Sequence, residues 1–151
     1  MTARMTNPAF VLAEATKPLI ALGAAVKASG LPPVIVELAN LRASQINGCS
    51  VCVHMHARDL RKAGESDERI DTVAGWRDAP WFTPAERAAL ELAEALTRLA
   101  DRADPVPDDV YAAAAEQFDE RQLAALVISI GAVNLWNRIN IATRQVAGVG
   151  Y

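Results

Sequence analysis

Apolar residues recur at helical spacing along most of this chain. In residues 10–29, for example, Phe10, Ala13 and Ile20 fall on successive turns of one helical face. Pro18 lies inside this segment, and because proline lacks the amide hydrogen of a helix interior we expect it to kink the helix or to split it in two. The pattern therefore predicts an N-terminal helix that is interrupted at Pro18.

Breaks and capping residues divide the rest of the chain into further helices. Gly30 and the Pro32-Pro33 pair end the first segment, and Asn47-Gly48 is a turn signal. The expected helices cover residues 34–45, 49–63, 67–74, 84–103, 108–118 and 120–146, with caps at Ser66, Thr83 and Asp119. No segment shows the sustained alternation of a β-strand, so we expect one all-α domain over residues 1–151, with six to eight helices.

Composition and charge indicate which classes of binding partner to expect. Apolar residues make up 52% of the 151 residues, which leads us to expect a homo-oligomer that buries apolar surface between copies. The net charge is −3 and the cations are scattered, which argues against nucleic acid as a partner. We find neither an apolar run of the length that spans a bilayer nor an export signal at the N-terminus, so we expect a cytoplasmic protein without a membrane partner.

The stretch from Asn47 to His56 holds both cysteines and both histidines of the chain. On a helix that begins at Cys49, successive residues rotate by about 100°. Cys49, Cys52 and His56 then share one stripe, whereas His54 lies on roughly the opposite side. The sequence thus brings one histidine to the thiols and separates the other from them.

This arrangement suits thiol redox chemistry. The first turn of a helix favours a thiolate over a thiol, and a nearby imidazole can accept the proton. Two cysteines with C-x-x-C spacing can close a disulfide after one of them is oxidised to a sulfenic acid. Glu37, an acid in the preceding apolar helix, is our candidate for the group that orients His56 and relays its proton.

Taken together, Glu37, Cys49-x-x-Cys52 and His56 resemble the alkylhydroperoxidase D-like (AhpD-like) group of the carboxymuconolactone decarboxylase superfamily. The resemblance extends over residues 33–99 and includes the words Ser44-Gln45-Ile46-Asn47-Gly48-Cys49, Met55-His56, Ala63-Gly64-Glu65 and Trp76-Arg77. Residues 134–140 are similar to that group too. In the most studied members a histidine stands between the two cysteines, where this chain has Val51.

The resemblance implies an all-α fold that forms a trimer or hexamer, and a thiol peroxidase without a cofactor or metal. It implies that Cys52 attacks the peroxide, that Cys49, at the more exposed helix start, resolves the sulfenic acid, and that Glu37 and His56 relay protons. The implied substrate is a small organic peroxide or hydrogen peroxide. The implied reductant is a dithiol, such as a dihydrolipoyl protein or a thioredoxin-like protein.

Other interpretations of the same residues stay open. The two cysteines could be an inert buried pair, or could bind zinc together with His54 and His56. The dithiol could serve a redox sensor or an assembly protein without enzymatic activity, or His56 could be the base of a decarboxylase-like enzyme. We expect Trp76, Trp81 and Phe82 to lie in the core or at a subunit contact, or to form walls of a pocket for an organic peroxide. We expect hydrogen bonds at a helix junction or subunit contact from four residues near the C-terminus, namely Asn134, Asn137, Arg138 and Asn140.

Overall fold

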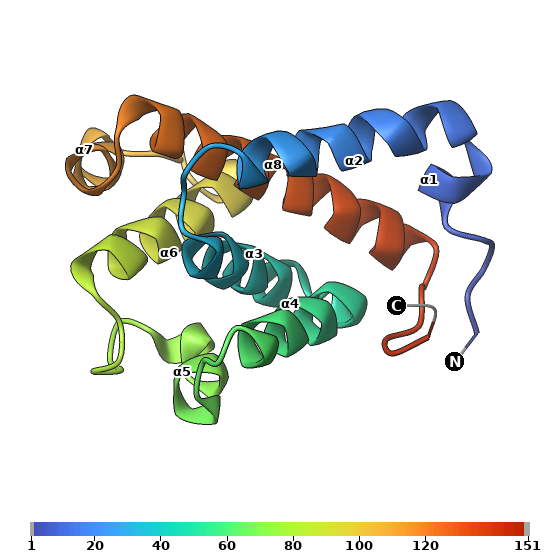
Figure 1. Ribbon diagram of the computed structural model, residues 1–151, viewed down its shortest axis with the longest axis horizontal. Helices are drawn as coiled ribbons and strands as arrows, with labels where there is room; N and C mark the ends of the chain where they lie inside the picture. Colours follow the sequence, from blue (N-terminus) through green and yellow to red (C-terminus); the bar gives the residue numbers. More distant parts are fainter. Residues whose placement is uncertain (1, 150–151) are drawn as a thin grey trace.

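The computed structural model describes residues 2–149, and this part of the chain folds into helices joined by turns, as predicted (Figure 1). It contains eight α-helices and two short 3₁₀ helices and no strand. The elements are α1 (Pro8–Val11), α2 (Ala13–Lys27), α3 (Pro33–Asn47), α4 (Ser50–Lys62), α5 (Asp67–Asp71), η1 (Val73–Gly75), α6 (Pro84–Thr97), η2 (Leu99–Asp101), α7 (Asp108–Gln117) and α8 (Glu120–Ala142).

Helix α3 occupies the centre of the fold. It packs against α4, α6 and α8 (Figure 1), and its residues Leu38 and Leu41 are almost fully buried. Ala39 and Ala43 are completely buried, and such small side chains let neighbouring helices approach closely. Because α3 is enclosed on several sides, an acid on this helix is held among the surrounding helices instead of extending freely into water.

Helix α8 is apolar on nearly all sides. Its inner face buries Leu126, Ile130 and Val133, while Ile128 and Leu135 are exposed. Among residues 2–149 it is the one helix that is long and apolar enough, by length and composition, to cross a membrane. Here α8 packs against α2, α3 and α6, as the core helix of a globular fold does.

The predicted helix starts agree with the structure better than the predicted ends. Thr83 and Asp119 both form capping boxes, and the Ser66 side chain accepts a hydrogen bond from the Arg69 backbone. The helix predicted to reach residue 103 ends at Thr97 and gives way to η2, and the one predicted to reach residue 146 ends at Ala142. The helix predicted for residues 67–74 ends at Asp71 and is followed by η1.

The predicted split of the helix at Pro18 is wrong. The N-terminal segment breaks at Leu12, and α2 continues through Pro18. A proline at this position removes one backbone hydrogen bond, to the carbonyl of Glu14. Both Glu14 and Pro18 are exposed, so water can hydrogen-bond to that carbonyl and the helix does not have to end.

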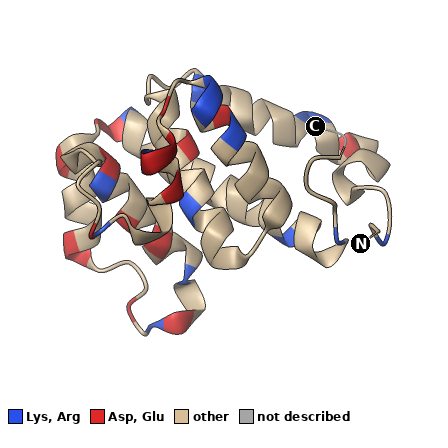
Figure 2. Ribbon diagram, turned by 90° about the horizontal axis from the view of Figure 1, so that it is seen from below, with Lys and Arg blue, Asp and Glu red and all other residues tan. Residues whose placement is uncertain are grey.

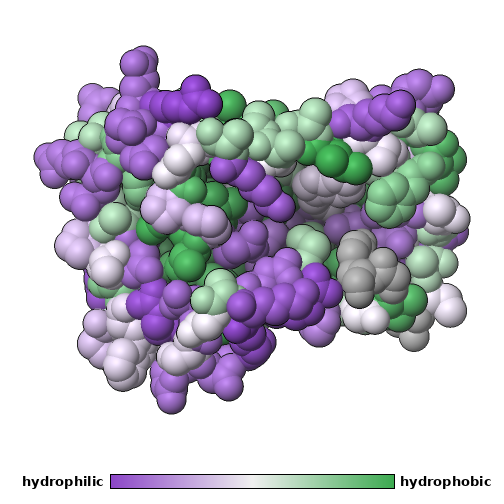
Figure 3. All heavy atoms as spheres, in the orientation of Figure 1, coloured by the Kyte–Doolittle hydropathy of each residue, from purple (hydrophilic) through white to green (hydrophobic). Residues whose placement is uncertain are grey.

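The two ends of the molecule differ in surface character. Charged residues are concentrated at the end formed by α5, α6 and α7, and the end formed by α1 and the start of α2 carries few (Figure 2). At that second end, apolar side chains gather on the surface (Figure 3), and Phe10, Leu12 and Ile20 are each more than half exposed. The Trp76 and Phe82 side chains are buried in the core, as expected, and Trp81 is 46% exposed.

Candidate functional site

The turn between α3 and α4 positions the two cysteines. Gly48 ends α3 with φ = 72°, a left-handed conformation that glycine adopts readily. Asn47 precedes it, and its Nδ2 donates to Oδ1 of both Asn134 (2.9 Å) and Asn137 (2.8 Å) on α8. These bonds fix the turn to α8, so that α4 begins at a defined place, and they confirm that residues 134 and 137 serve at a helix junction.

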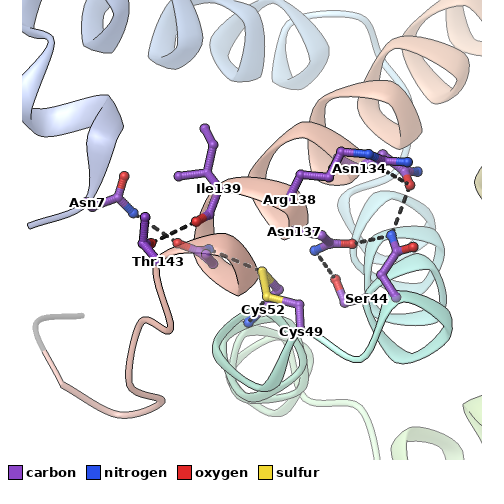
Figure 4. The surroundings of a disulfide bond; sticks show 11 residues. Asn7, Ser44, Cys49, Cys52, Asn134, Asn137, Arg138, Ile139 and Thr143 are labelled. Atoms are coloured by element: carbon purple, nitrogen blue, oxygen red, sulfur yellow. Dashed lines mark hydrogen bonds between the residues drawn. A yellow bond between two sulfur atoms is a disulfide. The ribbon is translucent and has the colours of Figure 1, made fainter. Parts of the chain in front are cut away.

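Cys49 and Cys52 are joined by a disulfide, with their Cα atoms 5.4 Å apart (Figure 4). Cys49 is the N-cap of α4, and its Sγ accepts a hydrogen bond from the Cys52 backbone N–H at 3.4 Å. The expectation that Cys49 is the more exposed thiol is wrong, because both cysteines are only 1% exposed. The Cys49 side chain is buried although Gly48 and Ser50 beside it are exposed, and helix position alone did not reveal this.

His56 and Glu37 lie in direct contact, as the sequence suggested. The Nδ1 of His56 is 2.7 Å from Oε2 of Glu37. An ionised carboxylate only accepts hydrogen bonds, so this contact requires the proton on Nδ1 and leaves the lone pair of a neutral imidazole on Nε2. The His56 side chain is 7% exposed and that of Glu37 is 26% exposed. The pair is therefore arranged so that Nε2 can accept a proton while the carboxylate holds the ring in place.

His54 lies on another side of α4 from the thiols, as the helical stripe predicted. His54 is exposed on α4, whereas Val51 is buried beside the cysteines. Within residues 2–149, no three His, Cys, Asp or Glu side chains are grouped so that they could hold a metal ion.

A cavity of about 380 Å³ opens beside this site. Cys52, His56 and Glu37 all contribute to its wall, whereas Cys49 does not. The remaining wall is mostly apolar and comes from α1, α2, α3, α4 and α8; it includes Phe10, Leu19, Ile20, Val26, Val36, Val51, Met55, Val133 and Trp136. The aromatic residues at the cavity are thus Phe10 and Trp136, and the alternative that Trp76, Trp81 and Phe82 form its walls is wrong.

Sequence reasoning gave Asn140 no chemical role, and it did not single out Asn7. Nδ2 of Asn140 donates to Sγ of Cys52 at 3.4 Å, and Oδ1 of Asn140 accepts from Nδ2 of Asn7 at 2.9 Å. A signal was present in α8, where Asn134, Asn137 and Asn140 recur every three residues on a mostly apolar helix. That spacing marks one polar face, which the structure directs toward the turn and the disulfide (Figure 4).

Comparisons with known proteins agree with this geometry. The model of the carboxymuconolactone decarboxylase family matches residues 13–95. A crystal structure from Agrobacterium tumefaciens, of a protein of unknown function suggested to be the antioxidant defence protein AhpD, superposes with a TM-score of 0.89. It is 36% identical, and the match covers 98% of this chain and 99% of that one.

Two curated relatives differ in how much of the chain they match. The uncharacterized protein YdfG of Bacillus subtilis is 41% identical over 116 residues, which cover 77% of this chain and 78% of YdfG. The alkyl hydroperoxide reductase AhpD of Bradyrhizobium diazoefficiens is 49% identical over 37 residues, which cover 24% of this chain and 20% of that protein. The relative that matches most of the chain is uncharacterized, and the one named as a reductase matches a short segment.

Proposed function

The chain belongs to the carboxymuconolactone decarboxylase family, as an AhpD-like member, and we propose that it reduces organic hydroperoxides with the dithiol of Cys49 and Cys52. One observation carries this proposal. Cys52, His56 and Glu37 border a single cavity, and Cys52 is already paired with a second cysteine in a disulfide. A nucleophile, a base with its orienting acid, and a resolving thiol are the groups that a two-cysteine peroxidase needs.

The reaction begins with the dithiol form. Nε2 of His56 first accepts the proton of the Cys52 thiol. The resulting thiolate attacks the distal oxygen of ROOH, the O–O bond breaks, and the leaving alkoxide takes that proton back from His56 to give ROH. Cys52 is now a sulfenic acid, oxidised by two electrons. The Cys49 thiol then loses its proton and attacks that sulfur, a disulfide forms, and the leaving hydroxide takes up the proton to become water. An external dithiol then reduces the disulfide by exchange and is itself oxidised to a disulfide.

Cys52 is assigned the attack because it borders the cavity and Cys49 does not. The helix N-terminus by itself favours the opposite choice, since the N-cap Cys49 already accepts a backbone hydrogen bond. Access to substrate decides between them, because a thiolate that cannot meet the peroxide cannot react with it.

The apolar wall favours an organic peroxide over hydrogen peroxide. Phe10, Ile20 and Trp136 offer contacts to an alkyl or aryl group, and burying one CH₂ group contributes about 0.8 kcal/mol. We expect kcat/KM to rise with chain length across a series of alkyl hydroperoxides until the cavity is full. Equal values for hydrogen peroxide and the longer substrates would contradict this preference.

Cysteine variants test the mechanism directly. Cys52→Ser is expected to abolish hydroperoxide consumption with dihydrolipoamide as reductant. Cys49→Ser is expected to stop at a sulfenic acid that dimedone traps. If both variants consume peroxide like the parent, the thiol mechanism is wrong. Activity that survives alkylation of both thiols would favour a decarboxylase-like reaction with His56 as base, and a single oxidation without turnover would favour a redox sensor.

The two histidines of α4 provide a matched pair. His56→Ala removes the partner of Glu37 and is expected to lower kcat by roughly 10²-fold or more. His54→Ala changes an exposed residue outside the cavity wall and is expected to keep the parent's rate. Equal losses in both variants would show that α4 tolerates no substitution and that the His56 effect is structural.

We also propose that the protein is a cytoplasmic homo-oligomer, a trimer or a hexamer. The support is the set of large apolar side chains on the surface, which include Phe10 and Ile20 at one end and Leu135 on α8. A dithiol that is recharged by thiol exchange also suits a reducing compartment. Light scattering after size-exclusion chromatography measures the mass, and a monomer at all concentrations would rule out the assembly.

A further inference from the structure

The Cys52 sulfur has a side-chain donor that the proposed mechanism does not use. Nδ2 of Asn140, on α8, lies 3.4 Å from Cys52 Sγ, and Asn140 is only 6% exposed. In Figure 4 this contact is the dashed line that reaches the disulfide from a side chain of α8 without a label. The contact joins residues 88 positions apart, so it depends on the packing of α8 against α4.

The amide of Asn140 is held in one orientation by a chain of hydrogen bonds. Oδ1 of Asn7 accepts from the Ala9 backbone N–H at 3.0 Å, as the N-cap of α1, so Asn7 turns its Nδ2 toward Asn140. Oδ1 of Asn140 accepts from that Nδ2 at 2.9 Å. With its oxygen engaged in this way, Asn140 can present only its NH₂ group to Cys52.

The N-terminal segment that carries Asn7 is bound to the end of α8 at further points. The Arg4 backbone N–H donates to the Thr143 carbonyl at 2.8 Å, and Gln145 Nε2 donates to the Met5 carbonyl at 2.9 Å. Asn7 itself is 5% exposed. A buried cap on a helix of only four residues is explained if its amide serves to fix Asn140 as well as to begin α1.

We propose that Asn140 stabilises the Cys52 thiolate in the reduced protein and that Asn7 is the positioning residue that aims it. A disulfide sulfur is a weak acceptor, whereas a thiolate carries a full negative charge, so the same N–H group stabilises the ionised form far more. Only ionisation is involved: the S–H bond breaks, its electron pair stays on sulfur, and the proton leaves to the imidazole or to water. The donor offsets the advantage that the helix start gives to Cys49, and it does so for the thiol that meets the cavity.

This inference rests on the proposed function only in requiring that Cys52 ionise, and its test uses no peroxide. In a Cys49→Ser background a single thiol titrates, and its thiolate absorbance is followed against pH. Asn140→Ala is expected to raise the pKa of Cys52 by about one unit, the usual size for a lost hydrogen bond to a charged group. Alkylation by iodoacetamide below that pKa should slow about tenfold in parallel.

Two further variants separate donation from packing. Asn140→Asp keeps the side-chain shape and can still accept from Asn7, but its carboxylate offers no donor and adds negative charge, so it is expected to raise the pKa of Cys52 further than alanine does. Asn7→Ala leaves Asn140 in place but free to rotate, and is expected to give a smaller rise.

Asn137→Ala is the matched control. Asn137 is also buried on α8, one turn earlier, but its Nδ2 donates to Ser44 and not to sulfur. It is expected to lower stability without moving the pKa of Cys52. An unchanged pKa in both Asn140→Asp and Asn7→Ala, or an equal rise in Asn137→Ala, would overturn the inference. If the parent reduces no peroxide but the ordered rises in pKa are found, the proposed function fails and the role of Asn140 stands.

Discussion

Two glutamates of this protein, Glu94 and Glu37, are held in opposite ways. Glu94, on α6, accepts hydrogen bonds from Arg42 Nε (2.7 Å), Arg77 Nη1 (2.6 Å) and Trp76 Nε1 (3.0 Å). Glu37, on α3, contacts His56 and borders the cavity. Their side chains are 9% and 26% exposed, respectively.

The difference shows how a structural carboxylate is distinguished from a candidate catalytic one. Burial would raise the pKa of Glu94, but the hydrogen bonds from Arg77, Trp76 and Arg42 outweigh it and hold the pKa below its usual range. Such a group stays ionised and has no capacity left for a substrate. Glu37 is paired with a titratable imidazole beside an open volume, where proton movement has consequences for a bound molecule.

The largest effect on stability is expected at Glu94. Glu94→Ala leaves Arg42, which is mostly buried, without its carboxylate, and should lower the free energy of unfolding by about 3–5 kcal/mol. Denaturant titration measures this. Glu91→Ala is the control one turn earlier on α6, because its bond to Arg77 is exposed and should contribute less than about 1 kcal/mol. Similar losses in the two variants would remove the distinction between the sites.

The largest effect on activity is expected at Glu37. Glu37→Gln can still accept from Nδ1 of His56 but cannot stabilise the imidazolium, so kcat/KM for a hydroperoxide should fall by roughly 10²-fold. The free energy of unfolding should change by less than about 1.5 kcal/mol, because one neutral hydrogen bond replaces one charged one. Steady-state kinetics and denaturant titration on the same preparation check both. A large loss of stability with a normal rate would reverse the roles of the two glutamates.

Acid is expected to weaken the fold partly through Glu94. Its pKa is lower in the folded state than in the unfolded chain, so on acidification the unfolded state binds protons first. The stabilisation is fully present above the unfolded value of about 4.3 and is lost as pH falls through the lower folded value. Glu94→Gln should therefore flatten the acid side of a plot of stability against pH. If the stability of Glu94→Gln falls with acidification as steeply as that of the parent, groups other than Glu94 cause the loss.

The smallest expected effect is the difference in stability loss between variants of the two arginines that bind Glu94. The Arg77 side chain is 53% exposed and that of Arg42 is 13% exposed. Arg77→Ala should cost about 1 kcal/mol, because water replaces much of what the guanidinium supplies, and Arg42→Ala should cost more. Thermal or denaturant unfolding of the two variants ranks them. The reverse order would mean that stacking of Arg77 on the Trp76 ring, at 4.2 Å from the centroid, outweighs burial.

The helix starts could be predicted from the sequence, and several of the ends could not. Thr83 and Asp119 act on backbone amides within their own first turn, so a few adjacent residues suffice to recognise them. The ends of α6 and α8 carry no comparable local signal, and helix-forming residues continue beyond Thr97 and Ala142. The end of α8 is instead contacted by a distant segment, since the Arg4 backbone N–H donates to the Thr143 carbonyl and Arg4 Nη1 donates to the Ala142 carbonyl. The break at Leu12 likewise involves a distant contact, because Asn7 caps a separate short helix whose N-cap side chain bonds to α8.

Helical periodicity in the sequence by itself determined the all-helical fold and placed Cys49, Cys52 and His56 on one face of a helix. The resemblance to the family came from Glu37, Cys49-x-x-Cys52 and His56 together. Only the tertiary structure decided that Cys49 is buried, that Cys52 alone of the two cysteines borders a cavity, and that Asn140, held by Asn7, donates to its sulfur. Burial, cavities and contacts across 88 or 133 positions depend on how helices pack against one another, and no local pattern encodes the distance between two helices.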